Sequence, residues 1–587
     1  MRLHNATTTS ALLRRALPAL AIVIAATLVI ACGEQSDQRD YVMPPADDDR
    51  PYTLVDLRHT EIQNPVDYRL HRDQYNYQGT YGFHRLFEHL EDNDYPWIAS
   101  DTHLTPARLE PFDILFINLV HDRMDDFTDN EVQAIKDFVH DGGGLFVIGD
   151  HTNVYRHAER VNRFLKPMGL EMMYHTVTDQ PPFYSVSGLG WIMMFDFADH
   201  PINDGVEMLS FKTGGPIAAD DPDDHLAFTS EDGFADYWDE RDDGGYYGTW
   251  SQGDDKQLEP SGPLSVASAT EYGDGRAVLV GDQNIFGDAW LNLGHNFEFA
   301  TNSFEWLAHN EETDRPIRDE PRKGHNIAFE SHVSHYQTAR NDGPGDGYYT
   351  FFIETNRNEA LTARATPGVE TKNTDTLFFL SSDIHFGEEE LDDRTYSDSD
   401  LDEISDFLES GGQAVITFEP DNIPEPTIGL LEHLLDGFAI EFGDQIWEPG
   451  DEATPTPTEL DGVHDIDSSH FTVDDLALTS LPSYEFPSND DYRDGAGGFS
   501  ESDFEFYLYD VRAQGGAPFV EAHTAEGDTI TVAQKFEVGD GELIVFIQDG
   551  FWRNRTLGDD ELLEPKSFFR TDIVEFQHRF LDYLRGV

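Results

Sequence analysis

The sequence predicts an α/β protein made of two tandem, doubly wound domains with a flavodoxin-like arrangement. Short apolar runs rich in β-branched residues are typical of strands buried on both faces of a parallel sheet, and capped amphipathic segments between them are typical of crossover helices. Both patterns return later in the chain with constant spacing. Of the 587 residues, 39% are hydrophobic and 12% aromatic, which is enough to bury a large core.

The first 32 residues have the features of an export signal. Arg14 and Arg15 precede an apolar run over 16–31 that is too short and too rich in alanine to remain as a membrane anchor. The run ends in Val-Ile-Ala-Cys, which resembles a bacterial lipobox, the motif whose cysteine is lipidated. Cys32 is also the only cysteine, although exported proteins usually pair their cysteines. We expect acylation of Cys32, with an uncleaved signal-anchor as the alternative.

Residues 33–50 lack hydrophobic periodicity and contain many Asp, Gln and Pro residues, so we expect an acidic, flexible tether. The expected location is the cell envelope, at the outer membrane or the outer face of the cytoplasmic membrane. Cys32 would attach the protein to membrane lipid there.

The first βαβ unit begins with residues 113–119, a short apolar run typical of a buried parallel strand. Thr128 to Glu131 form a capping box at the start of an amphipathic helix. The glycines at 142–144 end this helix, and residues 145–148 return to the sheet. A further amphipathic helix is expected over 81–90.

The same pattern returns 269 positions later, where Thr128 aligns with Ser397, Phe138 with Phe407 and Gly142 with Gly411. A second landmark, GDGRAVLVGDQNIF at 273–286, matches GDGELIVFIQDGFW at 539–552, and a helix pattern follows each. The sequence therefore predicts a tandem duplication. We expect its domains at 51–312 and 325–587, with a linker at 313–324.

The chain carries 114 Asp and Glu residues against 38 Lys and Arg, a formal net charge of −76. This charge argues against nucleic-acid binding, because affinity for the phosphate backbone comes from cations that displace counterions. The acidic residues are dispersed and only 8 cations are lysine, which favours a halophilic surface that stays solvated in high salt. Many bound Ca²⁺ ions are the alternative, since carboxylate oxygens are suitable ligands.

The succession of an apolar strand, a capped helix, GGG, LFVIGDH and the later GDGRAVLVGDQNIF resembles the class I glutamine amidotransferase-like superfamily, in particular its envelope branch. The resemblance covers both halves and is stronger in the first. It implies that active members attack an amide with a cysteine on a strained turn after a central strand. The turn at 149–151 follows a strand in this way but has no cysteine, so amidotransferase activity is excluded if Cys32 is lipidated.

Polar residues follow four predicted strands of the first half. In open α/β sheets, ligands collect beyond the carboxyl ends of the strands, near the switch in strand order. The candidates are Asp56 with His59, His121 with Asp122, Asp150 with His151, and Asp282 with Asn284. Three interpretations remain open: a divalent metal ion such as Zn²⁺ or Mn²⁺ held by His121, Asp150 and His151, ligand binding without chemistry, and roles in turns or helix caps.

The second half keeps part of this pattern. The matching residues are Glu330 with His332, Asp383 with His385, Glu419, and Gln548 with Asp549. The histidine of the third turn is absent and Pro420 replaces it, so the first half is the expected place of any chemistry. In the first half, an inserted aromatic stretch at 234–250 suits either stacking on sugar rings or local packing.

These observations predict a non-catalytic binding or scaffold module for an envelope glycan or protein partner. A metal-assisted hydrolase with catalytic residues His121, Asp150 and His151 is the alternative function.

Overall fold

The computed structural model describes residues 43–45, 48–60, 82–180, 184–185, 191–237, 259–288, 290–334, 347–381, 394–419, 423–442, 445–448, 463–467, 476–477, 505–509, 511–523, 529–553 and 568–587. The expected signal segment and Cys32 lie outside these residues. The chain divides into a unit at 1–47 and a unit at 48–587, and only the second is described below. No helix in the described ranges is long and apolar enough to cross a membrane.

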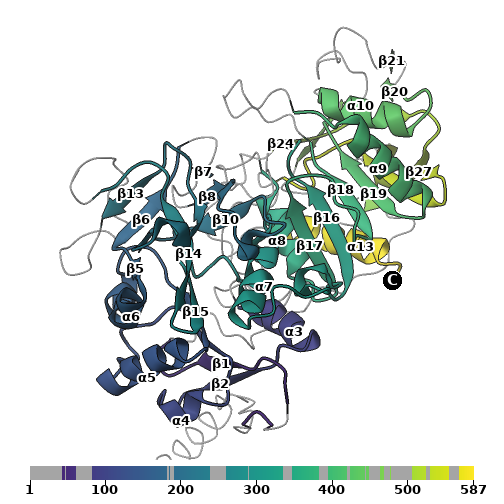
Figure 1. The fold of residues 1–587 in the computed structure, drawn as a ribbon. Coiled ribbons are helices and arrows are strands. Elements are labelled where there is room, and N and C mark those ends of the chain that lie inside the picture. Colours follow the sequence, from purple (N-terminus) through teal and green to yellow (C-terminus); the bar gives the residue numbers. More distant parts are fainter. Residues whose placement is uncertain are drawn as a thin grey trace, which may run out of the picture. The chain divides into compact units, whose positions relative to one another are not determined.

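The first half contains an eight-stranded sheet in the order β2-β1-β3-β4-β15-β14-β12-β9 (Figure 1). The five strands from β2 to β15 are parallel, and the last three join antiparallel. Their bounds are β1 Thr53–Asp56, β2 Trp97–Ser100, β3 Ile114–Ile117, β4 Gly144–Ile148, β9 Asp196–Phe197, β12 His225–Phe228, β14 Ser265–Tyr272 and β15 Gly275–Val280. The runs expected at 113–119 and 145–148 are therefore strands β3 and β4.

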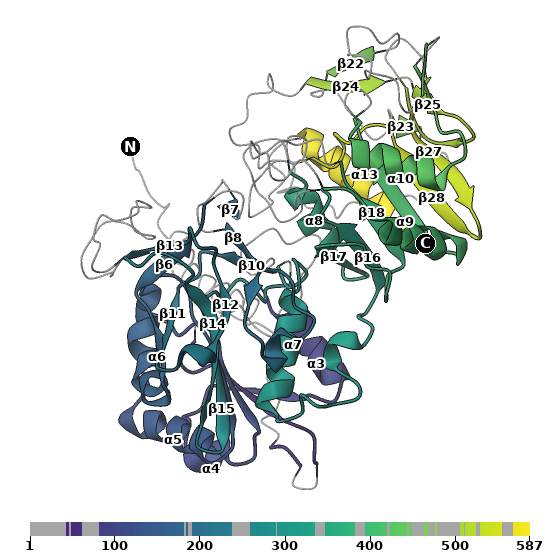
Figure 2. The same cartoon turned by 45° about the horizontal axis from the view of Figure 1, so that its top comes forward.

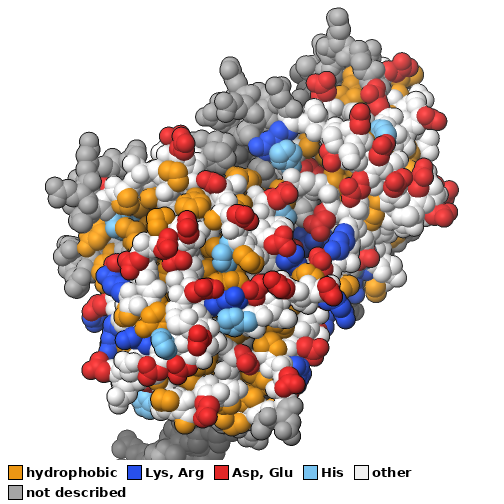
Figure 3. All heavy atoms as spheres, viewed as in Figure 1, with side chains coloured by type: hydrophobic (Ala, Val, Ile, Leu, Met, Phe, Trp, Pro, Cys, Tyr) orange, Lys and Arg blue, Asp and Glu red, His pale blue; other side chains and the backbone are white. Residues whose placement is uncertain are grey.

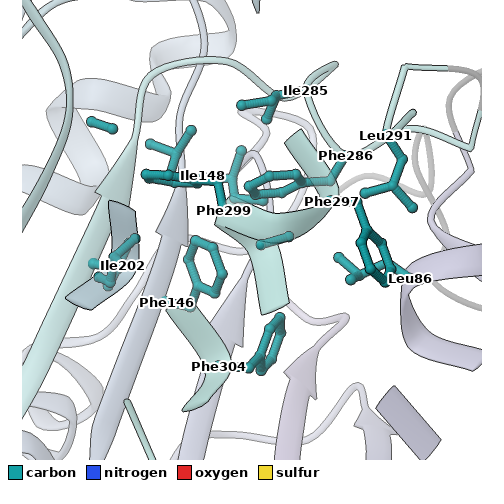
Figure 4. Close-up of a cluster of buried hydrophobic side chains, with 14 of the residues drawn as sticks. Leu86, Phe146, Ile148, Ile202, Ile285, Phe286, Leu291, Phe297, Phe299 and Phe304 are labelled. Carbon is teal, nitrogen blue, oxygen red and sulfur yellow. The ribbon is translucent and has the colours of Figure 1, made fainter. Parts of the chain in front are cut away.

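Helices cover both faces of this sheet (Figures 1 and 2). Helices α3 (His84–Asp92) and α7 (Asn296–Leu307) pack on one face, and α5 (Asp129–His140) and α6 (His157–Leu165) pack on the other. Alternate strand residues face opposite helices, as period-2 geometry requires. Figure 4 shows Phe146 of β4 beside Phe304 of α7, and their ring centroids are 5.3 Å apart. The neighbouring Leu145 joins the opposite core cluster.

The predicted cap of α5 is present. The Glu131 N–H donates to Thr128 Oγ1 at 3.2 Å, and the Thr128 N–H donates to Glu131 Oε2 at 2.8 Å. Gly142 ends the helix with a φ of 115°, a conformation that favours glycine. The equivalent helix of the second half, α9 (Asp398–Glu409), starts with the same reciprocal pair between Ser397 and Asp400.

The second half contains another eight-stranded sheet, in the order β17-β16-β18-β19-β28-β27-β26-β23. Five strands are again parallel and three antiparallel. Their bounds are β16 His325–Glu330, β17 Leu361–Thr366, β18 Thr376–Phe379, β19 Gln413–Thr417, β23 Leu476–Ala477, β26 Ala517–His523, β27 Thr529–Val538 and β28 Gly541–Phe546. Residues of α8 (Tyr349–Asn356) and α13 (Phe568–Leu584) pack in one core cluster, and residues of α9 and α10 (Glu425–Leu434) pack in the other.

The two sheets confirm the predicted α/β class, with large sheets that are mostly parallel. The domain boundaries remain predictions. Part of the expected linker at 313–324 is packed, since Ile317 is buried and its N–H donates to Glu305 Oε1 at 2.7 Å. Further contacts join the halves: Leu293 forms a parallel bridge with Ala365, and Arg85 donates to the Asn356 carbonyl oxygen at 2.6 Å.

Smaller sheets flank the large ones. In the first half, β6 (His175–Thr178) pairs with β13 (Phe234–Tyr237), and β5 (Leu170–Met172) pairs with β11 (Ile217–Ala219). A three-stranded sheet of the first half has the order β10 (Leu209–Lys212), β8 (Trp191–Met194), β7 (Tyr184–Ser185). A three-stranded sheet of the second half has the order β21 (Gln445–Trp447), β20 (Ile440–Phe442), β25 (Val511–Ala513). Also in the second half, β22 (Val463–Asp467) pairs with β24 (Glu505–Tyr509). Strand β13 is the beginning of the aromatic stretch at 234–250, whose remainder lies outside the described residues.

Acidic side chains are spread over the face of the molecule that Figure 3 shows, in agreement with their dispersal along the sequence.

Candidate functional site

The turn after β4 holds Asp150 inside the protein. The Asp150 N–H donates to Nε2 of His157 at 3.1 Å, and His157 Nδ1 donates to the Val154 carbonyl oxygen at 2.7 Å. These two bonds fit a neutral imidazole, and burial lowers the pKa of His157 to about 4. Thr152 has a φ of 52°, so the turn carries backbone strain of the kind that collects at functional sites.

His151 is also enclosed. Its Nδ1 lies 3.1 Å from Thr152 Oγ1, and its N–H donates to Asp150 Oδ1 at 2.7 Å. Burial, reinforced by the nearby His157, lowers the pKa of His151 to about 3, so this imidazole is neutral at physiological pH.

Asp150 and Asp282 each lie two residues after the end of their strand, and the two strands are neighbours in the sheet. Ile148 of β4 pairs with Val280 of β15, and each carboxyl group comes two residues later. Asp282 accepts the N–H of Lys212 at 2.6 Å and the N–H of Asn284 at 2.7 Å. Burial raises the pKa of Asp282 to about 7. The pKa of Asp150 is raised well above its usual value by burial and by the charge of Asp282.

A second cluster lies at the ends of β1 and β3. His59 Nδ1 is 2.9 Å from Asp56 Oδ2, and His59 Nε2 is 3.6 Å from Glu131 Oε1. The His59 ring stacks on Phe127, with centroids 3.9 Å apart. Burial of Glu131 would raise its pKa, but hydrogen bonds from Thr128 and His103 and the charge of His59 lower that pKa to about 2.

The crevice between β1 and β3 is closed by the chain itself. Strand order reverses here, because β2 lies on one side of β1 and β3 on the other, so this is where such sheets usually bind ligands. Instead, Thr60 and Val120 form a bridge across it, and the His121 N–H donates to the His59 carbonyl oxygen at 3.0 Å.

His121 and Asp122 differ in exposure. His121 is buried, stacks on Tyr155 with centroids 4.0 Å apart, and accepts the Arg123 N–H at its Nδ1 at 3.0 Å. Asp122 is exposed, although one carboxylate oxygen lies 3.1 Å from His121 Nδ1.

The expected residues therefore fall into two clusters and one exposed position. Asp56, His59 and His121 lie in one cluster, Asp150, His151, Asp282 and Asn284 lie in the other, and Asp122 is exposed. His151 Nε2 and Asp150 Oδ1 are 4.0 Å apart. Within the described ranges, no group of three or more His, Cys, Asp or Glu side chains is arranged to hold a metal ion.

Three members of these clusters were not expected from the sequence. Lys212 and His157 reach the Asp150–Asp282 pair from segments whose position depends on tertiary packing. Glu131 was recognised only as a helix cap, although it also contacts His59. No local sequence signal marks Lys212. His157 is the first residue of the helix that follows Asp150, seven positions later, and this short separation allows the two residues to be in contact.

In the second half, the equivalent strand ends also hold enclosed acids. Glu330 accepts the N–H of Val333 at 2.8 Å, and burial raises the pKa of Glu330 to about 7. Asp549 accepts the Tyr348 hydroxyl at 2.8 Å and pairs with Arg553. The candidates Asp383 and His385 lie outside the described residues.

Two open hollows are lined by residues outside these clusters. One cavity of about 390 Å³ is lined by Arg85, Glu88, Arg322 and Lys323 among others, and ion pairs such as Lys323 with Glu88 at 2.9 Å cross it. A groove of about 530 Å³ lies beside α6 and is lined partly by Tyr174, His175 and Tyr237.

No protein-family model and no curated protein matches the chain. Among solved structures, the N-terminal domain of mmIFT52 has a TM-score of 0.33 and 14% identity and covers 45% of this chain and 99% of that domain. A cytoplasmic protein from Salmonella typhimurium has a TM-score of 0.26 and 11% identity, covering 44% of this chain and 98% of its own. A ThuA-like protein from Bacteroides uniformis has a TM-score of 0.26 and 10% identity, and its match covers 47% of this chain and 99% of the ThuA-like protein. At these TM-scores, the fold assignment rests on the chain's own sheets.

Proposed function

We propose that this chain is an exported, lipid-anchored envelope protein that binds a glycan or protein partner without chemistry of its own. Its body would be a tandem duplication of an amidotransferase-like α/β domain that lacks the nucleophile. The acidic, lysine-poor composition suits a surface exposed to high salt.

The matching strand orders of the two sheets support the duplication. Their glycines support it as well. A Cβ atom on Gly143 would meet Phe138, and one on Gly412 would meet the aligned Phe407, at 2.4 Å in both cases. Equivalent close approaches at aligned positions are expected when two domains descend from one sequence.

One observation carries the non-catalytic assignment: apart from the exposed Asp122, the strand-end groups are enclosed. Asp56, His59, Asp150, His151 and Asp282 are each at most 4% exposed. Their contacts described above are with backbone groups, with each other and with the buried side chains of Glu131, Phe127 and Thr152. The chain has no cysteine beyond Cys32, so no thiolate is available at the strained turn. Enclosed and mutually bonded groups stabilise a fold, whereas catalytic groups must reach a substrate.

Elemental analysis of protein purified without a chelator tests this assignment against a metal-assisted hydrolase. We expect the amount of transition metal to stay well below one equivalent per chain, because the described histidines and carboxylates form no ligand set. We expect the same trace level in His151→Ala. One equivalent in the wild type that is lost in His151→Ala, together with hydrolytic activity, would establish the hydrolase instead.

Cell fractionation of a Cys32→Ala variant tests the lipid anchor. The wild type is expected in the membrane fraction, and the variant is expected in the soluble exported fraction, because stable attachment takes two signals such as dual acylation and the variant lacks the cysteine that would be acylated. Mass spectrometry of the wild type checks the chemistry directly. An intact leader with an unmodified Cys32 thiol would contradict lipidation.

A further inference from the structure

The groove beside α6 combines a helix face with an aromatic strand pair. Helix α6 and the short helix after it, Lys166–Met168, contribute one wall. The ribbon of β6 and β13 contributes to the other wall, together with Tyr174 just before β6 and residues of β5 and β11. Figures 1 and 2 both show this ribbon next to α6. The volume of about 530 Å³ lies within the range of small-molecule sites, roughly 300–1,000 Å³.

The helix wall is polar and regular. Glu159, Arg163 and Lys166 recur every three or four residues, which places them on one side of the helix, and all three line the groove. Asn162 also lines it, but its amide is used by Met172: it donates to the Met172 carbonyl oxygen and accepts the Met172 N–H, each at 2.9 Å.

The opposite wall is aromatic. His175 and Tyr237 are directly paired across the antiparallel ribbon, with ring centroids 5.3 Å apart and an angle of 69° between the rings. Tyr174 adds a third, partly buried ring. Tyrosine and histidine rings present apolar faces together with polar edges, the combination that suits the C–H faces and hydroxyl groups of a sugar.

The charges of the groove are balanced and already paired. Lys166 lies 2.6 Å from Glu171, Arg163 donates to Asp129 at 2.7 Å, and Glu159 is bound by Arg156 at 2.9 Å. Two acids and two bases line a groove in a chain whose net charge is −76. A polyanionic ligand would be repelled by the surrounding surface, and a cationic one would find no surplus of acids in the groove.

We propose that this groove binds a neutral carbohydrate, with its rings on Tyr174 and Tyr237 and its hydroxyl groups on Glu159, Glu171 and Arg163. This proposal rests on the binding function proposed above and gives it a site and a ligand class. The ribbon is tied to the turn after β4, because the Thr152 N–H donates to the His175 carbonyl oxygen at 2.7 Å. The groove therefore adjoins the carboxyl end of a central strand, where open α/β sheets recognise ligands.

Calorimetric titration of the full-length protein in detergent and high salt tests the proposal. The probes are maltohexaose, cellohexaose and chitohexaose, with a galacturonate hexamer as the acidic counterpart. At least one neutral hexamer is expected to bind, and Tyr237→Ala or Tyr174→Ala is expected to raise its Kd about tenfold or more. Tyr237→Phe keeps the ring and is expected to stay within about threefold of the wild type.

Tyr272→Ala is the matched control, since Tyr272 is a partly buried tyrosine at the end of β14 and does not line the groove. Thermal unfolding of each variant establishes that it is folded. If a neutral hexamer binds but Tyr237→Ala and Tyr174→Ala leave its Kd unchanged, the groove assignment is wrong while the binding function stands. Tighter binding of the galacturonate hexamer, or no binding by any neutral hexamer, overturns the ligand class.

Discussion

Replacing Gly275 with alanine is expected to destabilise the protein by about 3 kcal/mol or more. A Cβ atom there would lie 2.0 Å from the Val139 carbonyl oxygen and 2.4 Å from that of Gly143. Both contacts are with backbone at the end of α5, so the clash is relieved only by moving the helix end away from β15. The measurement is the free energy of unfolding from urea titrations at constant salt.

The same substitution at Gly541 is expected to have a similar effect, because a Cβ atom there would lie 2.2 Å from the Leu408 carbonyl oxygen and 2.4 Å from that of Gly412. Gly429→Ala is the control. Gly429 lies within α10 with open space around it, so alanine is expected to be neutral or to stabilise by about 0.5–1 kcal/mol. A Gly541→Ala protein as stable as the wild type would contradict the structural equivalence of the two positions.

Local chemistry explains why the sequence predicted much of the fold. The caps at Thr128 and Ser397 depend on side chains three residues apart, so their pattern is visible in the chain itself. The strands β3 and β4 were visible for a similar reason, since strands buried on both faces are apolar without interruption. Sequence reasoning therefore worked wherever a single element determines its own form.

The site was less predictable because its contacts join distant segments. Placing Asp150 and Asp282 after strands was correct, and parallel pairing of β4 with β15 makes them neighbours. No local pattern indicates that Lys212 reaches Asp282 from 70 residues away, or that Thr60 and Val120 close the crevice beside β1. The burial of these side chains could not be predicted either, because the sequence around an Asp at a strand end is the same whether its carboxyl group faces solvent or is buried.

Asp282→Asn is expected to change how stability depends on pH. The pKa of Asp282 is about 7 in the folded protein against 3.8 for an ordinary aspartate, so the native state binds more protons than the unfolded state between these values. The contribution of Asp282 is thus fully present below about pH 4, declines as pH rises towards 7, and is constant above. Asparagine stays neutral throughout and removes this decline.

At pH 5 the variant is expected to be less stable than the wild type. The amide nitrogen of asparagine cannot accept a hydrogen bond, so either the Lys212 or the Asn284 N–H loses its partner. Between pH 5 and pH 8, the stability of the variant relative to the wild type is expected to improve by roughly 3 kcal/mol, because the carboxyl group at position 282 is present and ionises only in the wild type. Unfolding titrations of both proteins at each pH measure this difference.

The comparison isolates Asp282 from opposing groups. Burial lowers the pKa of His151 to about 3 and that of His157 to about 4, so their contribution is present above about pH 6.5 and is lost as pH falls towards those values. Both proteins share that loss, and it cancels in the difference. Repeating the titrations at low and high KCl separates buried from surface carboxylates, since salt screens only the latter effectively. A difference that does not vary with pH would mean that Asp282 ionises normally in the fold, and the two strand-end carboxyl groups would then have to reach solvent.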